Sequence, residues 1–303
     1  MVHKHHEMCS LSLMNLGLNS DLMEQMLVQN CVKKVQLLPA VNDDHGGVII
    51  ELEEPMDPNV FHNMLRSSLR QWKLQGKKGV WIKMPIELVN LVETAVKEGF
   101  WYHHAEPHYL MLVYWIPETE NTIPANASHR VGIGAIVLNE KRELLVVQES
   151  SGRMKGTGIW KIPTGVVEEA EDIFEGAVRE VKEETGIETE FLEVLAFRQM
   201  HKSFFGKSDL FFICMMRPLT FNLQKQDLEI EAVQWMSLEQ YASQPLIQKH
   251  GIFKYIKDLC LAKAEGDYLG FTPVPIKSYF GYPASYLYFN EDDLVQENSA
   301  INL

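Results

Sequence analysis

The hydrophobic pattern of residues 41–116 switches repeatedly between the period of a strand and that of a helix. Apolar residues spaced about 3.6 positions apart predict an amphipathic helix, whereas short runs rich in β-branched and aromatic residues predict strands. Asp57-Pro58 is a typical helix start, and Gly99 is a typical residue just beyond a helix end. This part of the chain is therefore predicted to be a small α+β domain, with strands at 47–54, 78–85 and 108–116 and helices at 57–76 and 85–100.

A second alternation of the same kind follows residue 128. Strand-like segments are interrupted by a turn at 139–142, by a glycine-rich loop at 151–158 and by a long amphipathic stretch at 172–185. This order is typical of a mixed sheet covered by helices. The predicted strands are 130–138, 143–149, 159–165, 191–200, 209–216 and 231–237, and a further helix begins at 237.

The segment 117–128 separates these two series because it is polar, contains prolines and has no hydrophobic period. At 303 residues the chain is long enough for two domains of ordinary size. Residues 1–40 have no clean period and are predicted to form a loosely structured leader with one short helix near 21–29. We therefore expect a leader at 1–40, an α+β domain at 41–116, a linker at 117–128, a second domain at 129–270, and an aromatic, proline-rich tail at 271–303 that resists regular assignment.

Charge and composition narrow the classes of partner. The net charge of −13 repels a nucleic-acid backbone, so a phosphate-containing substrate would need a cation between it and the protein. No apolar run approaches the roughly 20 residues of a membrane span, and the first forty residues resemble neither a signal nor a transit peptide. The four cysteines lie far apart in sequence, which favours neither disulfides nor a zinc site. We expect a cytoplasmic protein that binds neither nucleic acid nor membrane.

The stretch 172–185 carries the clearest chemical signal. On a helix, Glu180, Glu183 and Glu184 lie at positions i, i+3 and i+4 and share one face. Like charges at this spacing destabilise a helix, so three clustered carboxylates indicate either full solvation or a bound cation. Magnesium prefers oxygen ligands and is normally held by one or two carboxylates together with substrate phosphates. The same helix has an apolar face of Ile173, Ala177, Val178 and Val181, a capping box of Asp172 and Glu175, and Gly186 beyond its end.

Two further charged residues are placed to orient these glutamates. Arg179 precedes Glu180 by one residue and Glu183 by four, within reach of both. Glu171 lies at the start of the helix, where the helix dipole favours an anion. We expect Arg179 and Glu171 to hold the metal-binding carboxylates in place.

The chain from Gly165 to Ile187 resembles the Nudix box of the Nudix hydrolases at every defined position. The matching residues are Gly165, Glu171 and the run Arg179-Glu180-Val181-Lys182-Glu183-Glu184-Thr185-Gly186-Ile187. The fixed Gly, Glu and Arg positions would coincide by chance at a given start about once in 10⁸ to 10⁹. The resemblance implies a Nudix fold, a mixed sheet between helices, and a box helix that holds Mg²⁺ or Mn²⁺. In this family water attacks a phosphorus of a nucleoside diphosphate linked to another moiety.

The resemblance also implies roles for individual residues of the box. Glu180 and Glu184 would be the main metal ligands. Glu183 would be a further ligand or the group that orients water. The main-chain carbonyl of Thr164, just before the box, commonly completes the coordination of the metal.

Residues outside the box are candidates for the general base and for substrate contacts. The base is a box glutamate in some members of the family and a loop residue in others, so Glu229 and Glu231 are candidates beside Glu183. Each candidate outside the box has an alternative role, as a surface charge, a packed core residue or a loop anchor. The substrate candidates are Arg198, Gln199 and His201 for diphosphate or ribose, Trp160, Phe204 and Phe205 for stacking on adenine, and Arg153 or Lys155 for phosphate.

The resemblance extends beyond the box to stretches such as "EGFWYHHAEPHYLMLVYWI" and "LAFRQMHKSFFGKSDLFFIC". Together they resemble two-domain Nudix hydrolases typified by plant cytosolic enzymes that cleave ADP-ribose and NADH. In this group the first domain is similar to an acetyltransferase. Residues 47–116 lack a Gln/Arg-x-x-Gly-x-Gly/Ala phosphate loop, so packing or homodimer formation is expected rather than acetyl-CoA chemistry. The alternatives are a nucleotide-binding sensor without catalysis, or an enzyme acting on CoA, dinucleoside polyphosphates, inositol pyrophosphates or capped RNA.

Overall fold

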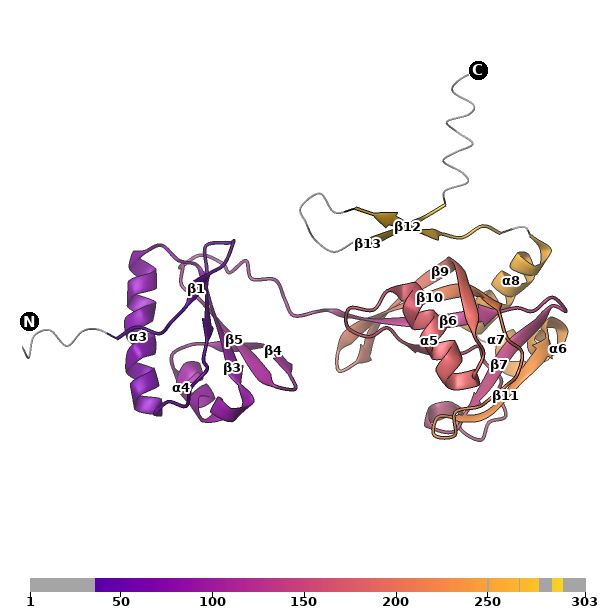
Figure 1. The fold of residues 1–303 in the computed structure, drawn as a ribbon, viewed down its shortest axis with the longest axis horizontal. Helices are drawn as coiled ribbons and strands as arrows, with labels where there is room; N and C mark the ends of the chain where they lie inside the picture. The colour runs from indigo at the N-terminus through magenta and orange to yellow at the C-terminus, as the bar shows by residue number, and fades with distance from the viewer. Residues whose placement is uncertain (1–35, 250, 267, 278–284, 291–303) are drawn as a thin grey trace, which may run out of the picture. The chain divides into compact units, whose positions relative to one another are not determined.

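The computed structural model describes residues 36–249, 251–266, 268–277 and 285–290 (Figure 1). They form two compact units that divide between Asn126 and Ala127, inside the polar segment 117–128. The short helix predicted near residues 21–29 lies outside the described residues. Each unit has its own hydrophobic core.

The N-terminal unit is one five-stranded sheet with helices packed against it. Its elements are β1 (Val41–Asn42), β2 (Val48–Glu51), α3 (Pro58–Leu74), β3 (Gly79–Pro85), the 3₁₀ helix η2 (Ile86–Leu91), α4 (Val92–Lys97), β4 (Trp101–Glu106) and β5 (Tyr109–Trp115). The strand order is β1-β2-β3-β5-β4, and only β2 and β3 run parallel. Asp57 caps α3 as predicted, because its Oδ1 accepts from the main-chain N–H of Asn59 at 2.8 Å.

Two elements of this unit differ from the predicted pattern. The segment 85–100 starts as a 3₁₀ helix and becomes α-helical only at Val92. The strand β4, with sequence WYHHAE, was not predicted. It lies at the edge of the sheet and pairs only with β5, so it needs no continuous apolar face. The core also begins before residue 41, because Leu38 is buried and its N–H donates to Ser68 Oγ at 2.8 Å.

The C-terminal unit is built on a four-stranded mixed sheet of order β8-β6-β10-β9, with β7 and β11 paired separately. Its elements are β6 (His129–Val137), β7 (Glu143–Glu149), the 3₁₀ helix η3 (Gly152–Met154), β8 (Thr164–Val166), α5 (Ile173–Thr185), β9 (Thr189–Phe204), β10 (Lys207–Pro218), β11 (Ile230–Ser237), α6 (Leu238–Ser243), α7 (Pro245–Lys249) and α8 (Gly251–Glu265). Strands β6 and β10 run parallel, whereas the other pairs are antiparallel.

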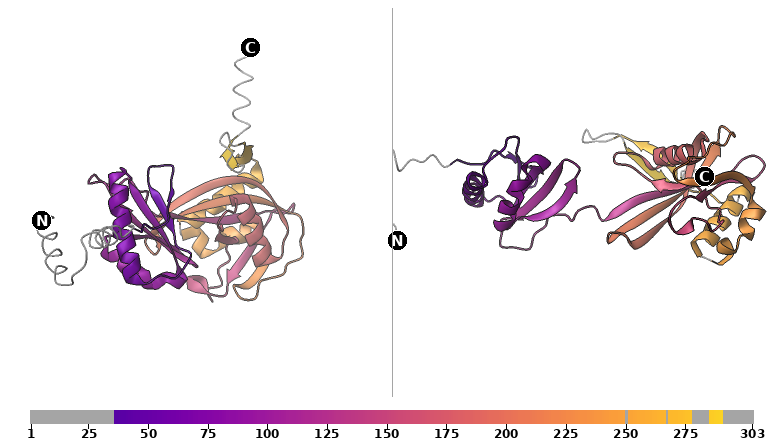
Figure 2. Two further views of the ribbon diagram at one scale, coloured as in Figure 1. Left: turned by 60° about the vertical axis from the view of Figure 1, so that its left-hand side comes forward. Right: turned by 90° about the horizontal axis from the view of Figure 1, so that it is seen from below.

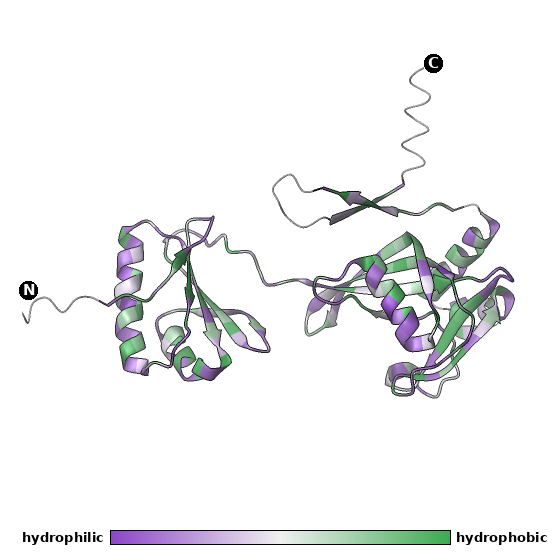
Figure 3. Cartoon of the chain, in the orientation of Figure 1, coloured by the Kyte–Doolittle hydropathy of each residue, from purple (hydrophilic) through white to green (hydrophobic). Residues whose placement is uncertain are grey.

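Helices cover both faces of the four-stranded sheet (Figure 2). On one face Val181 of α5 packs with Ile133 of β6 and Cys214 of β10. On the other face Ile256 of α8 packs with Ile213 of β10. The strands are mostly hydrophobic, while α5 also carries many hydrophilic residues (Figure 3). These layers confirm the predicted mixed sheet between helices. In the described part of the chain, no helix is both long and apolar enough to cross a membrane.

The tail contains a regular element that the sequence pattern did not predict. Strands β12 (Thr272–Ile276) and β13 (Ser285–Phe289) pair antiparallel. Two prolines, Pro273 and Pro275, interrupt the donor pattern expected of a strand, which explains why the segment resisted assignment. The hairpin is joined to the unit through Phe271, which exchanges two main-chain hydrogen bonds with Val194 of β9, each 2.8 Å long.

Candidate active site

Helix α5 is held at both ends by the residues predicted from its sequence. Asp172 and Glu175 form a capping box, in which the Asp172 main-chain N–H donates to Glu175 Oε2 at 3.1 Å. Gly186 follows the helix with a φ of 73°, a left-handed conformation that glycine adopts without steric strain. The apolar side of the helix packs on the sheet through Ala177 and Val181. These contacts fix the rotation of the helix and therefore the direction of each glutamate.

Glu180 packs directly against Gly165 of β8. A Cβ atom at residue 165 would lie 1.8 Å from Glu180 Cδ, so only glycine leaves room for this carboxylate. Glu180 Oε1 also accepts from the Val166 N–H at 3.1 Å. Burial raises the pKa of the Glu180 carboxyl, and hydrogen bonding to Arg179 opposes that rise. The close approach of β8 and α5 thus depends on one glycine.

Arg179 connects the helix to the loop that precedes it. Its Nε and Nη2 atoms donate to the two oxygens of Glu171 at 2.7 and 2.8 Å, a bidentate pair. Its Nη1 atom donates to Glu180 Oε1 at 2.9 Å and to Glu183 Oε2 at 3.2 Å. The hydrogen bond from Arg179 lowers the pKa of the Glu171 carboxyl. Arg179 therefore orients two of the three clustered glutamates and is itself oriented by Glu171.

Glu184 is the buried carboxylate of the box, with only 7% of its surface exposed. Its Oε2 atom has no hydrogen-bond partner among the described residues. Burial raises the pKa of the Glu184 carboxyl to about 8, although the charge of Lys161 and the main-chain N–H of Thr164 act in the opposite direction. A buried carboxylate oxygen without a partner is costly, so this atom is suited to receive a cation.

Two charged residues that the sequence pattern did not single out, Glu149 and Lys161, lie beside Glu184. Lys161 Nζ donates to Glu149 Oε1 at 2.6 Å and to Thr164 Oγ1 at 2.6 Å. Both residues belong to strand-like segments in which a lone charge is usually solvent-exposed. No motif spacing could have found them, because β7 and the segment before β8 come together only in the fold.

A cavity of about 250 Å³ opens next to these residues. One side of it is formed by Glu149, Lys161 and Thr164. The remaining wall is largely apolar and contains one cation and one anion. Most of it comes from β9, β10 and α8: Arg198, Met200, Asp209, Phe211, Ile252, Phe253 and Ile256. Met154 of the glycine-rich loop and Ile162 complete it. A charged end joined to an apolar wall is suited to a ligand that carries both phosphate and a ring.

The structure brings only some of the predicted substrate residues to this cavity. Arg198 lines it, whereas Gln199 and His201 alternate with Arg198 and Met200 along β9 and therefore face away. Gln199 instead lies 2.6 Å from His129 Nε2, and His201 Nδ1 lies 2.9 Å from Ser208 Oγ.

The predicted aromatic contacts also lie elsewhere. Phe204 and Phe205 stand at the tip of the β9–β10 hairpin, where the Arg130 guanidinium lies 5.1 Å from the Phe204 ring. The Trp160 side chain packs into the core, and its main-chain N–H donates to Gln244 Oε1 at 2.8 Å. None of these three aromatic residues lines the cavity beside the box.

The remaining charged candidates are exposed. Glu229 and Glu231 have exposed side chains at the start of β11, and neither lines the cavity beside the box. Arg153 and Lys155 are also exposed, and only Met154 between them reaches the cavity wall. Two carboxylates outside the box line this cavity, Glu149 and Asp209.

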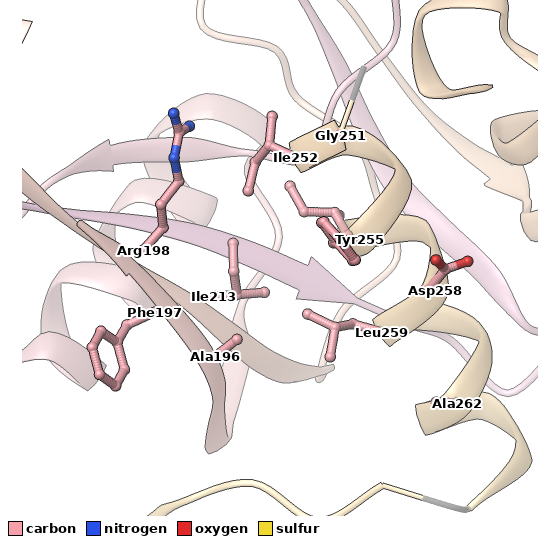
Figure 4. A pocket seen from close by; sticks show the side chains of 11 residues that line it. Ala196, Phe197, Arg198, Ile213, Gly251, Ile252, Tyr255, Asp258, Leu259 and Ala262 are labelled. Atoms are coloured by element: carbon pink, nitrogen blue, oxygen red, sulfur yellow. The ribbon is translucent and has the colours of Figure 1, made fainter. Parts of the chain in front are cut away.

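A larger apolar cavity of about 790 Å³ lies beside the first, between β9, β10 and α8 (Figure 4). Arg198 and Ile252 stand at one end of it and Ala262 at the other, with Ile213, Tyr255 and Leu259 between them (Figure 4). Arg198, Ile252 and Ile256 line both cavities, so the two are neighbours.

Comparison with known proteins decides the family. A sequence model of the NUDIX domain matches residues 128–259, and one of the Nudix hydrolase domain matches residues 38–116. Nudix hydrolase 2 of Arabidopsis thaliana is 60% identical over 262 residues, which cover 86% of this chain and 94% of that protein. The chain belongs to the Nudix hydrolase family. Nudix hydrolase 10 of Arabidopsis thaliana is 59% identical over 265 residues, covering 88% of this chain and 94% of that protein. The human nucleoside diphosphate-linked moiety X motif 6 is 38% identical over 208 residues, covering 66% and 65%.

Nudix hydrolases generally need divalent metal ions, and the residues of this Nudix box fit one. The donors are carboxylate and main-chain oxygens, the atoms that hard cations prefer. Glu184 offers a buried oxygen without a partner among the described residues, and Gly165 leaves the space that Glu180 fills. In the described part of the chain, no three Asp, Glu, His or Cys side chains already converge as a ready metal-binding group. Arg179 Nη1 instead donates hydrogen bonds to both Glu180 and Glu183.

Proposed function

We propose that this protein hydrolyses the pyrophosphate bond of nucleoside diphosphate derivatives, with ADP-ribose and NADH as substrates. The products would be AMP with ribose 5-phosphate, or AMP with reduced nicotinamide mononucleotide. The observation that carries the proposal is a complete Nudix box preceded directly by Thr164, which lines a cavity that is charged at one end and apolar at the other. Names of relatives state the family and leave the substrate open.

In this proposal four residues would hold Mg²⁺ or Mn²⁺. They are Glu180, Glu184 and Glu183 through their carboxylates, and Thr164 through its main-chain carbonyl. The bound ion would neutralise the pyrophosphate and make its phosphorus more electrophilic. Arg179 and Glu171 would keep the carboxylates in place, as their hydrogen bonds in the structure support.

The roles of the other residues follow from exposure and position. Glu183 is the most exposed of the three clustered glutamates, with 56% of its side chain accessible, so it is the best placed to orient or deprotonate a water. Arg198 would bind the diphosphate, because a guanidinium matches phosphate oxygens and this one lines the cavity. Phe211 and Met200 would contact the ring of the substrate. We further propose that the protein acts as a homodimer in the cytoplasm.

The test is chromatographic. The purified protein is incubated with ADP-ribose, NADH, NAD, FAD, CoA, diadenosine polyphosphates and inositol pyrophosphates, in Mg²⁺, Mn²⁺ or EDTA. Glu184→Gln is run beside it, with Glu140→Gln as a control for an exposed carboxylate in the β6–β7 turn. We expect AMP from ADP-ribose or NADH only with metal, full activity in Glu140→Gln, and a loss of about 10²-fold or more in Glu184→Gln.

A second outcome would favour another class of protein. If no compound is cleaved but ADP-ribose binds with a saturable isotherm, the protein is a nucleotide sensor and the enzyme proposal is wrong. If CoA or an inositol pyrophosphate is the preferred substrate, the reaction class stands and the assignment of ADP-ribose and NADH is withdrawn.

A further inference from the structure

Lys161 is a buried lysine at the edge of the carboxylate site, with 7% of its surface exposed. Lysine is almost never buried unless its charge is paired. Here the ammonium lies 2.6 Å from Glu149 Oε1 and donates to Thr164 Oγ1 at 2.6 Å. The main chain of Lys161 is equally constrained, because it exchanges two hydrogen bonds of 2.9 and 3.0 Å with Val147 of β7.

These contacts continue to Glu184, the buried glutamate of the Nudix box. Lys161 bonds the side chain of Thr164, and the main-chain N–H of Thr164 interacts with Glu184. Glu149 and Lys161 also line the same cavity as Thr164. A single ammonium therefore joins β7 to the residue whose carbonyl stands next to Gly165, where β8 meets the box helix.

We propose that Lys161 is a positioning residue of this site, which ties Glu149 to Thr164 and thereby holds the Thr164 main chain beside Glu184. The inference rests on the proposed function, since it concerns the same metal-binding carboxylates. The role is separate from that of Arg179, which contacts Glu171, Glu180 and Glu183. Lys161 would organise the Glu184 side of the site and Arg179 the Glu180 side.

Two properties of Lys161, its charge and its positioning of Thr164, predict opposite effects on cation binding when the lysine is removed. Lys161 and Glu149 together carry no net charge, so the pair neither attracts nor repels a divalent cation strongly. Lys161→Met would leave Glu149 unpaired next to Glu184, and the added negative charge alone would tighten cation binding. Loss of positioning would instead weaken cation binding, because Thr164 would no longer be held in place.

The experiment measures Mn²⁺ binding to the full chain by calorimetry or by the electron paramagnetic resonance signal of free Mn²⁺. We expect Lys161→Met to weaken Mn²⁺ binding by about 10-fold or more, and to lower kcat about 10- to 100-fold with KM nearly unchanged. The matched control is Lys141→Met, an exposed lysine in the β6–β7 turn, which should leave both quantities unchanged.

Two further variants keep the test decisive if Lys161→Met does not fold. Thr164→Val keeps the Lys161–Glu149 pair and removes only the hydroxyl acceptor, so it should weaken Mn²⁺ binding in the same direction by a smaller factor. The double variant Glu149→Gln/Lys161→Met removes both charges of the pair, the buried one on Lys161 and the half-buried one on Glu149, which should restore folding but not Mn²⁺ affinity.

Tighter or unchanged Mn²⁺ binding in Lys161→Met and in the double variant would overturn the proposal. A large rise in KM with unchanged kcat would also overturn it, because Lys161 would then bind substrate directly. The Mn²⁺ measurement needs no substrate. A wild-type protein that binds Mn²⁺ but cleaves nothing would therefore refute the proposed function while leaving this inference to be decided by the variants.

Discussion

At the scale of single residues, the site is governed by what each side chain is packed against. Glu180, Glu183 and Glu184 are adjacent on one helix, yet they differ in burial and in partners. Glu184 is buried with an unpaired oxygen among the described residues, whereas Glu183 is mostly exposed. Three chemically identical groups thereby become suited to different tasks, a buried ligand and an accessible base among them.

The steric fit of Gly165 and Glu180 predicts the effect of one methyl group. In Gly165→Ala the new Cβ atom would overlap the Glu180 carboxylate, so Glu180 must leave its position or β8 must move. We expect Mn²⁺ affinity and turnover each to fall by about 10-fold or more. Isothermal titration of Mn²⁺ and initial-rate assays would measure both.

The control for this prediction is Gly251→Ala, at the start of α8, where a Cβ atom would meet nothing within 4 Å. It should behave like the wild-type protein. If Gly165→Ala also binds Mn²⁺ normally, Glu180 has another position from which it can act, and the steric argument is wrong.

The raised pKa of Glu184 predicts how stability changes with pH in the metal-free protein. The folded protein binds this proton more tightly than the unfolded chain, because the pKa rises from 4.5 to about 8 on folding. The contribution of Glu184 to stability is therefore complete below about pH 4.5 and is lost as the pH rises through about 8. In EDTA, the free energy of unfolding of the wild-type protein should fall as the pH rises from about 4.5 to about 8. Glu184→Gln should lack the part of this fall that comes from Glu184.

Urea unfolding at several pH values between 5 and 8.5 would measure the difference between the two proteins. Glu140→Gln serves as the control, because it removes an exposed carboxylate far from the box in sequence. Parallel stability curves for the wild-type protein and Glu184→Gln would show that Glu184 does not titrate in this range.

At the scale of elements, the box is a helix and a loop held together by one arginine. Arg179 bonds Glu171 in the loop, the Val166 carbonyl in β8 and two glutamates of its own helix. Its planar guanidinium makes these contacts simultaneously, which the single ammonium of a lysine cannot do.

Arg179→Lys therefore keeps the charge but should lose most of the geometry. We expect kcat to fall about 10- to 100-fold while the circular dichroism spectrum stays unchanged. Arg217→Lys, which alters an exposed ion pair with Glu190 on β9, is the matched control and should have no effect. Full activity in Arg179→Lys would mean that charge alone suffices at this position.

At the scale of the whole molecule, each of the two units contains a complete core. The last buried hydrophobic residue of the N-terminal unit is Val113, and the first of the C-terminal unit is Ile133. Every residue that lines the cavity beside the Nudix box belongs to the C-terminal unit. The residues that line this cavity and the residues of the N-terminal unit thus lie in separate parts of the chain.

This separation predicts that residues 127–303 retain the site when expressed alone. We expect Mn²⁺ affinity within about threefold of the full chain, because units with independent cores fold independently. The measurement is the Mn²⁺ titration used above, with hydrolysis assayed in parallel. A loss of more than about tenfold would show that the N-terminal unit supports the site, directly or through assembly.

The sequence by itself determined the features that depend on interactions between residues close together in the chain. The period of α5, its capping box and Gly186 were all readable, because helix termini depend on hydrogen bonds within a few residues. The spacing of Glu180, Glu183 and Glu184 was readable for the same reason, as was their link to Arg179 four residues or fewer away. The match to the Nudix box was also readable, and the mixed sheet between helices was predicted from the alternation of strand and helix periods after residue 128.

The tertiary structure decided everything that depends on residues distant in sequence. It alone brought Glu149 to Lys161 and Thr164, and it placed Arg198 in the cavity while turning Gln199 away. It also gave β4 and the β12–β13 hairpin their strand form, since edge pairing and proline-containing strands leave no clear hydrophobic period. Burial, which decides the protonation of Glu184, arises from packing of the whole unit and has no signature in the local sequence.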